Sequence, residues 1–141
     1  MRLCLPSKPT LTLAAATLSA LALGACGTTV STNGYKGEAE AVAKRVANFE
    51  SNVTASEAAK ICTEDLAVVV KARLKANGGD CESALKRQLK QVDVPELTIH
   101  SIEVKGPAAK ARVRSTWSGK TAESTLVLTR EGTSWRIASL Q

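Results

Sequence analysis

The sequence of 141 residues predicts an α+β domain in which three helical segments pack on a curved, four-stranded antiparallel sheet. Two observations support this prediction. Between residues 38 and 91 apolar residues recur at steps of three and four, the period of a helix, and after Pro95 they recur at steps of two, the period of a strand. Because the helices come first and short turns join the strands, we expect the helices to cover one face of the sheet.

Residues 1–25 have the three parts of a secretory signal. Arg2 and Lys8 form the basic start, an uncharged apolar run extends from Leu11 to Leu23, and two small residues follow it. The apolar run is too short to be a stable membrane-spanning helix. We therefore expect this segment to be removed during export, which leaves a chain with the size of one domain and a tether.

The residue that follows the signal is Cys26, and Leu23-Gly24-Ala25-Cys26 resembles the lipobox of bacterial lipoproteins. The resemblance implies cleavage before Cys26 and a thioether-linked diacylglycerol on its sulfur. Such a group would anchor the protein at the extracytoplasmic face of the cell membrane, because two acyl chains hold a protein stably. The alternatives are an ordinary signal peptide that leaves Cys26 as a free thiol, or an uncleaved anchor.

Composition limits the expected partners. The leader holds two of the 19 basic residues and none of the 13 acidic ones, so its removal lowers the formal charge from +6 to +4. A mildly basic protein at a membrane surface meets anionic lipid and wall polymer first. The chain has one Phe and one Tyr, too few aromatic side chains to stack on nucleic-acid bases, so we expect no nucleic-acid partner.

Residues 26–37 are rich in Gly, Thr and Ser and lack an apolar period, so we expect a lipidated cysteine followed by a flexible tether. The domain proper then covers residues 38–141. Its first helix is expected to begin at Glu38, since Glu38 and Glu40 suit the positive end of the helix dipole. The apolar stripe of this helix consists of Val42, Val46, Phe49 and Val53.

A second helical segment is expected to begin at Thr54, because Thr54 and Glu57 have the spacing of a capping box. After a break near Thr63, helical spacing continues to the stop signal Asn77-Gly78-Gly79. The apolar residues of this part are Leu66, Val69, Val70 and Leu74. Asp80 is a favoured N-cap and predicts the third segment.

Four strands are expected after Pro95. In the first strand the apolar phase changes between Ile99 and Ile102, which predicts a bulge near His100 and Ser101. The second strand alternates strictly from Ala109 to Trp117 and so predicts one buried and one solvated face. Turns are expected at Gly106-Pro107, Ser118-Gly119-Lys120 and Glu131-Gly132-Thr133, with the remaining strands at residues 122–128 and 135–140.

Cys62 and Cys81 lie 19 residues apart in a chain that carries an export signal. Exported proteins reach an oxidising compartment, where disulfides form, so we expect these two cysteines to be bonded. A redox role would need a C-x-x-C motif, which the sequence lacks, and one histidine with two cysteines is too few ligands for zinc. We therefore expect no metal site.

The second strand places Lys110, Arg112 and Arg114 on its solvated side. A solvated sheet face that resists edge pairing is one interpretation of this row. A cationic surface for anionic lipid, wall polymer or an acidic envelope protein is the other. Trp117 and Trp135 are expected to be large core residues, and either could instead form the wall of a small pocket.

The order of elements also resembles a known family. A long first helix, a second helix that contains Cys62, a third that opens with Cys81 and a last strand entered through Gly132 to Ile137 resemble small lipoproteins of the nuclear-transport-factor-two-like superfamily, also called SnoaL-like or cystatin-like. The resemblance covers residues 38–141 and implies a cone-like arrangement around a cavity. Enzymes of this fold, such as ketosteroid isomerase and scytalone dehydratase, fill that cavity with acids and bases.

In this chain the residues for such chemistry are not where an enzyme needs them. His100 is expected at the surface, and Glu103 and Glu123 have outward parity. We therefore interpret the protein as a membrane-anchored lipoprotein that acts as a small binding module, with no catalytic residue and no cofactor. One alternative is an isomerase- or hydrolase-like enzyme with an inward Glu103 or Glu123. Another is an accessory subunit of a cell-envelope complex.

Overall fold

The computed structural model describes residues 30–91, 96–117 and 119–141. The predicted signal peptide, residues 1–25, and Cys26 lie outside the described residues. Helices precede a four-stranded antiparallel sheet, so the predicted α+β class is confirmed. Within the described residues no helix is both long enough and apolar enough to cross a membrane.

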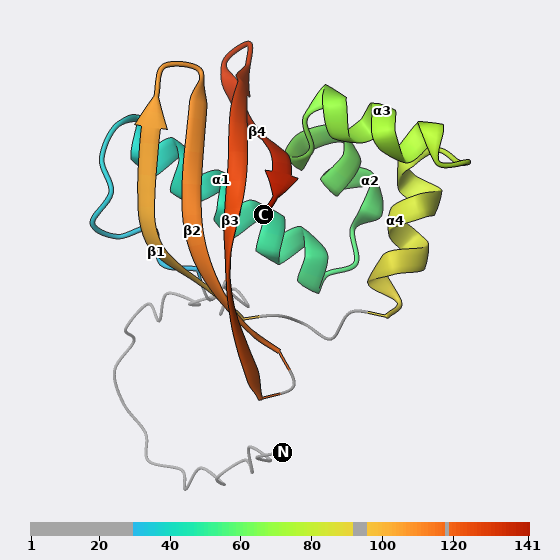
Figure 1. Ribbon diagram of the computed structural model, residues 1–141, viewed down its shortest axis with the longest axis horizontal. Helices are drawn as coiled ribbons and strands as arrows, with labels where there is room; N and C mark the ends of the chain where they lie inside the picture. The colour runs from blue at the N-terminus through green and yellow to red at the C-terminus, as the bar shows by residue number, and fades with distance from the viewer. Residues whose placement is uncertain (1–29, 92–95, 118) are drawn as a thin grey trace, which may run out of the picture.

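The sheet is a meander of β1 (Glu96–Lys105), β2 (Ala108–Trp117), β3 (Lys120–Glu131) and β4 (Ser134–Leu140), in that spatial order (Figure 1). The register of β1 against β2 shifts between Ile99 and Ser101, which confirms the predicted bulge. Gly106 has a φ of 56°, a left-handed conformation that suits glycine in the tight turn between β1 and β2.

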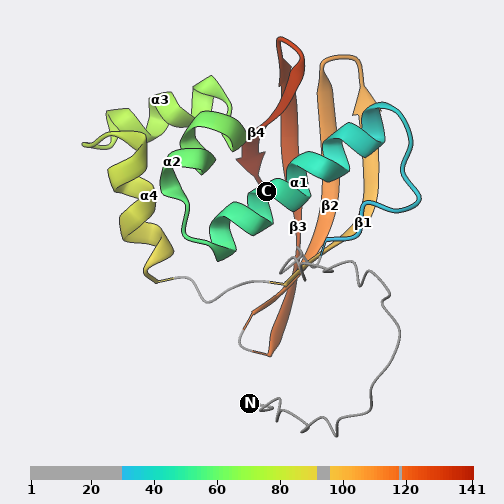
Figure 2. The same ribbon diagram turned by 180° about the vertical axis from the view of Figure 1, so that it is seen from behind.

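Helix α1 (Glu38–Thr54) crosses one face of the sheet, as the view from behind shows (Figure 2). It begins at the predicted residue, and Val42 and Val46 of its apolar stripe are fully buried. The sheet supplies the other side of the core. Its buried side chains are Leu97, Ala109, Ala111, Val113, Leu126, Leu128, Trp135 and Ile137.

The remaining helices lie beside the edge strand β4 (Figure 1). They are α2 (Ala58–Lys60), the π-helix η1 (Ile61–Asp65), α3 (Val68–Ala76) and α4 (Cys81–Leu89). Leu66 forms a parallel bridge with Ile137, and the amide of Ala67 donates to the Ile137 carbonyl at 2.9 Å. This short extended link covers part of the β4 edge, which would otherwise be open to pairing.

The break predicted near Thr63 comes slightly later in the chain, where Leu66 is extended. Thr63 belongs to η1, and its hydroxyl donates to the Ala59 carbonyl at 2.9 Å. The extended link resets the helical phase. Val70 and Leu74 therefore pack on the core, whereas Val69 is 45% exposed, so the predicted apolar stripe is wrong at that residue.

The predicted capping box is also wrong. Helix α1 continues through Thr54, and Ser56 then turns the chain with a φ of 56°. Glu57 occupies the N-cap position of α2, but its side chain makes no capping hydrogen bond and pairs with Lys60 at 3.1 Å. The threonine is thus still helical and cannot serve as the cap of the next segment.

The disulfide between Cys62 and Cys81 is confirmed, with 6.1 Å between the two Cα atoms. Asp80 caps α4 as predicted, because its carboxylate accepts from the Ser83 amide at 2.9 Å. That hydrogen bond holds the pKa of the Asp80 carboxyl below its usual value. By closing the chain from η1 to α4, the disulfide stabilises the domain by about 3 kcal/mol in the chain-entropy description.

Part of the predicted tether is packed against the domain. Val30 is 4% exposed, and its amide donates to Oε2 of Glu50 at 3.3 Å. Glu50 is 3% exposed, and its other oxygen accepts from the Leu97 amide at 3.4 Å. One buried carboxylate therefore joins the start of the described chain, α1 and β1. The expectation of a flexible segment up to residue 37 is corrected at Val30.

Candidate functional site

The open face of the sheet, which is the side that α1 does not cover, carries the predicted basic row. Lys110, Arg112 and Arg114 are all exposed and alternate along β2 with the buried Ala109, Ala111 and Val113. The strand period of two thus directs the three cations to one side, as the sequence predicts. The register places Lys110 opposite Val127 and Arg114 opposite Glu123.

Two carboxylates lie among these cations. Glu123 accepts from Arg114 at 2.9 Å and lies 3.7 Å from Arg112, and Glu103 lies 2.7 Å from Lys105. The hydrogen bond from Arg114 lowers the pKa of the Glu123 carboxyl, and the one from Lys105 lowers that of Glu103. Both carboxyls are therefore ionised at neutral pH. Cations still exceed anions on this face, so an incoming anion meets excess positive charge.

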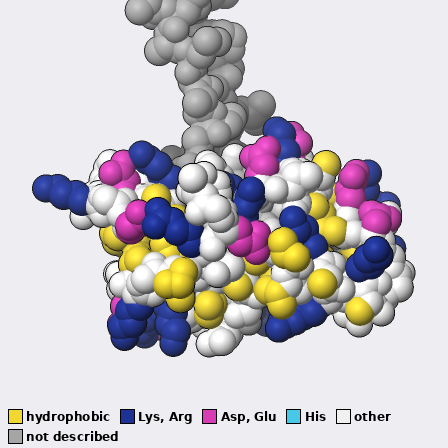
Figure 3. Space-filling model, turned by 90° about the horizontal axis from the view of Figure 1, so that it is seen from above, with side chains coloured by type: hydrophobic (Ala, Val, Ile, Leu, Met, Phe, Trp, Pro, Cys, Tyr) yellow, Lys and Arg dark blue, Asp and Glu magenta, His cyan; other side chains and the backbone are white. Residues whose placement is uncertain are grey.

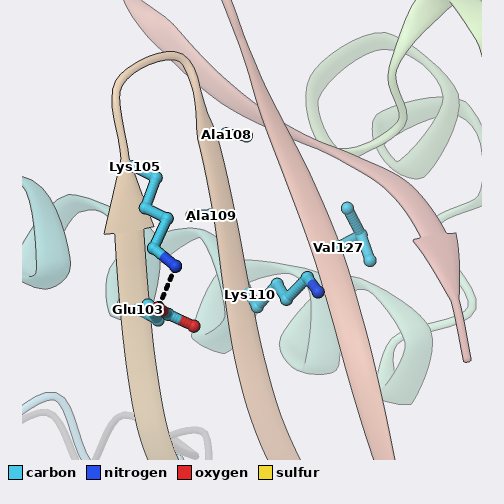
Figure 4. Close-up of a pocket in the computed structure, with 6 residues that line it drawn as sticks. All are labelled: Glu103, Lys105, Ala108, Ala109, Lys110 and Val127. Atoms are coloured by element: carbon cyan, nitrogen blue, oxygen red, sulfur yellow. Dashed lines mark ion pairs between the residues drawn. The ribbon is translucent and has the colours of Figure 1, made fainter.

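Described residues line two shallow depressions on the open face. The larger, of about 140 Å³, is lined by Glu103, Lys105, Lys110 and Val127 together with Ala108 and Ala109 (Figure 4). The other, of about 90 Å³, is lined by His100, Arg112, Val113 and Glu123. Both sizes suit a small anionic group better than a whole drug-sized molecule.

The surface around one end of the sheet is mixed in character. Seen from the end that carries the β1–β2 turn, Lys and Arg side chains alternate with Asp and Glu and with small apolar areas (Figure 3). Such interspersed charge keeps an exposed surface soluble.

A third hollow, of about 330 Å³, lies away from the sheet between α3 and α4. It is lined by Leu74, Asn77, Ala84, Arg87, Gln88 and Gln91.

Trp135 is a core residue, with 3% of its surface exposed. Its indole N–H donates to Glu38 at 2.9 Å, and Arg130 donates to the same carboxylate at 2.6 Å. The guanidinium carbon of Arg130 also lies over the Trp135 ring, 5.6 Å from the ring centre. The indole and guanidinium hydrogen bonds lower the pKa of the Glu38 carboxyl. The structure thus places Trp135 in the core, in contact with the start of α1. Trp117 ends β2, and its side chain lies outside the described part of the chain.

Sequence reasoning missed two buried carboxylates. Glu50 is one, and its position four residues after Val46 on the apolar stripe was a signal that could have found it. Asp65 is the other, with no exposed surface. It accepts from Arg45 at 2.7 Å and from the Asn52 amide at 2.7 Å. No pattern in the sequence around Asp65 indicates these partners. Asp65 belongs to the π-helix η1, and both of its partners belong to α1.

The sequence offers acidic residues and one histidine that could act as acids or bases. Glu103, Glu123 and His100 are exposed on the open face, in agreement with their predicted parity. The buried carboxylates Glu50 and Asp65 accept hydrogen bonds from neighbouring groups of the domain. Among the described residues, His, Cys, Asp and Glu form no group of three or more that could hold a metal ion.

Comparison with known families and structures adds to this description. Residues 36–140 match the model of a family described as "Putative lumazine-binding". No curated protein matches the chain.

The solved structures that are similar to the chain include the following two. One is a de novo designed NTF2 fold protein, with 13% identity over 68% of this chain and 80% of the design and a TM-score of 0.47. The other is titled as a "Putative NTF2-like transpeptidase" from Campylobacter jejuni, with 12% identity over 65% of this chain and 92% of that one and a TM-score of 0.44.

We predict that Asp65→Ala will destabilise the domain by about 3–5 kcal/mol, because it leaves the guanidinium of Arg45 buried without its counter-ion. Arg45 has 16% of its side chain exposed and Asp65 has none. Urea unfolding followed by circular dichroism measures the change. Glu40→Ala, which breaks the exposed Lys44–Glu40 pair on the same helix, is the control and should cost less than about 1 kcal/mol. Equal losses in the two variants would contradict a structural role for Asp65.

Proposed function

The chain belongs to the family described as "Putative lumazine-binding", and from that premise we propose that it is a small, non-catalytic binding module of the cell envelope. Its contact surface is the open face of the sheet, and its ligand is anionic. The observation that carries the proposal is the row of Lys110, Arg112 and Arg114, all exposed and all directed away from the core.

The charge of the open face favours an anionic ligand. Glu123 pairs with Arg112 and Arg114, and Glu103 pairs with Lys105. These ion pairs hold the cations side by side, because they offset the repulsion between the cations. A repeating anion can contact successive cations, because alternate residues of a strand lie roughly 6–7 Å apart. Acidic wall polymer, anionic lipid headgroups and an acidic protein segment all have this chemistry.

The placement of the acidic residues supports binding over catalysis. General acid or base work in a cavity needs a carboxyl or imidazole beside the substrate. Here Glu103 and Glu123 are paired with cations in solvent, and Asp65 is fully buried against Arg45. Each of these carboxylates already has a cationic partner within the domain.

The location in the envelope rests on the leader. We propose that Cys26 carries the diacylglycerol that its lipobox resemblance implies, and that the domain acts at the extracytoplasmic face of the membrane. A cationic surface held at this position meets anionic polymer and lipid at high local concentration. The export signal and the bonded pair Cys62–Cys81 both fit an oxidising compartment.

We predict that Cys26→Ser will release the protein from the membrane fraction, because the variant lacks the sulfur that would carry both acyl chains. Intact-mass measurement of the membrane-extracted protein should show cleavage before Cys26 and an added diacylglyceryl group. Cys4→Ser, in the leader, is the control and should change neither location nor mass. An unmodified Cys26 in the membrane fraction would contradict the anchor.

We predict that the soluble domain will bind vesicles of phosphatidylglycerol, or polyglutamate, with an affinity that falls steeply with salt. Exposed charges are screened over about 10 Å at 0.1 M salt and about 3 Å at 1 M. Replacing Lys110, Arg112 and Arg114 together by Gln should abolish this binding, and Gln avoids a new repulsion with Glu123. Cosedimentation measures binding to the vesicles, and fluorescence anisotropy measures binding to polyglutamate. Binding of lumazine is measured in parallel.

The control for that experiment changes the same amount of charge elsewhere. Lys71, Arg73 and Lys75 of α3 are replaced by Gln, and this variant should keep most of the binding. Equal losses in both variants would show that net charge alone is responsible. Binding that does not depend on salt, or tight binding of lumazine alone, would contradict an anionic ligand on the open face.

A further inference from the structure

We infer that the domain stands on the membrane with its β2–β3 hairpin against the lipid headgroups, so that the opposite end of the sheet points away from the bilayer. The inference rests on the proposed lipid anchor at Cys26. It adds an interaction surface, the residues Thr116 and Lys120–Glu123 of the hairpin, and it assigns the bilayer that holds the anchor as the partner of that surface.

The first step is the position of Val30. The Glu50 carboxylate binds the amides of both Val30 and Leu97, so Val30 lies at the same end of the sheet as the start of β1. Leu97 pairs with Ser115, and Glu96 pairs with Thr116, two residues before the hairpin turn. Val30 and the β2–β3 hairpin are thus at one end of the molecule.

The second step is the length of chain between Val30 and the anchor. Three residues separate Cys26 from Val30. Fully extended, the four steps from Cα to Cα span at most about 14 Å. Strand β2 has ten residues and is therefore about 33 Å long. The chain is too short to pass along the sheet, so the end with Val30 must face the bilayer.

The third step is the exposure of the hairpin itself. From Thr125 to Thr129 half-buried and buried residues alternate along β3, whereas Lys120, Thr121, Ala122 and Glu123 are all exposed. Both faces of β3 are therefore open from Lys120 to Glu123. Figure 1 shows β2 and β3 extending beyond the helices there.

The distance from Leu97 to the hairpin turn is similar to the length of chain between Val30 and the anchor. The turn lies about three residues, or roughly 10 Å, beyond the level of Leu97. A connection of at most about 14 Å leaves little room between that turn and the lipid surface. Lys120 at the turn is cationic, which suits anionic headgroups, while the β1–β2 and β3–β4 turns lie at the far end.

The test uses the full lipidated chain in vesicles that contain phosphatidylglycerol and a lipid spin-labelled at its headgroup. A fluorophore is attached through Thr121→Cys in one variant and through Thr133→Cys in the other, with the native disulfide left oxidised. Both threonines are exposed, and they lie at opposite ends of the sheet. We expect several-fold stronger quenching at position 121 than at position 133.

A second arm changes only the free length of chain. Eight Gly and Ser residues inserted between Gly27 and Thr28 leave Val30 and its contact with Glu50 intact, and should lower the quenching at position 121 to nearly that at position 133. Equal quenching at the two positions without the insertion, on protein whose mass shows a lipidated Cys26, would overturn the orientation alone. An unmodified Cys26 would overturn the anchor proposal and the orientation together.

Discussion

The buried carboxylate of Glu50 is the interaction on which the arrangement of the domain depends. Glu50 is the last buried residue along α1, and its carboxylate accepts from the amides of Val30 and Leu97. A buried carboxyl group is costly unless hydrogen bonds satisfy it, so the segments with Val30 and Leu97 meet at this point of the helix. The contact fixes where β1 begins against α1 and where the segment with Val30 meets the domain.

Once α1 occupies one face, the sheet has two different chemical surfaces. The covered face is apolar and contains Leu126, Leu128 and Ile137, while the open face carries Lys110, Arg112 and Arg114 with their carboxylate partners. The interior carboxylates stabilise the packing, and the exterior ones order the cations. This division is the basis of our proposal that ligands bind at the open face.

Strong local patterns were enough to predict much of this structure from the sequence. The alternation of β2 fixed the direction of the basic row, the phase change near His100 predicted the bulge, and Asp80 marked the start of α4. Features that depend on contacts between residues far apart in the sequence could not be predicted. The spacing of Thr54 and Glu57 could not reveal that α1 continues, and nothing near Asp65 indicated that Arg45 and Asn52 would surround it.

The central claim is that ligands contact the open face and not the interior, and three neighbouring residues of β3 can test it. Val127 lies on the open face beside Lys110, whereas Leu126 and Leu128 are buried under α1. Methyl-resolved NMR titration with polyglutamate should shift the Val127 methyl signals and leave those of Leu126 and Leu128 in place. Shifts confined to Leu126 and Leu128 would contradict the claim, because they would place the ligand inside the domain.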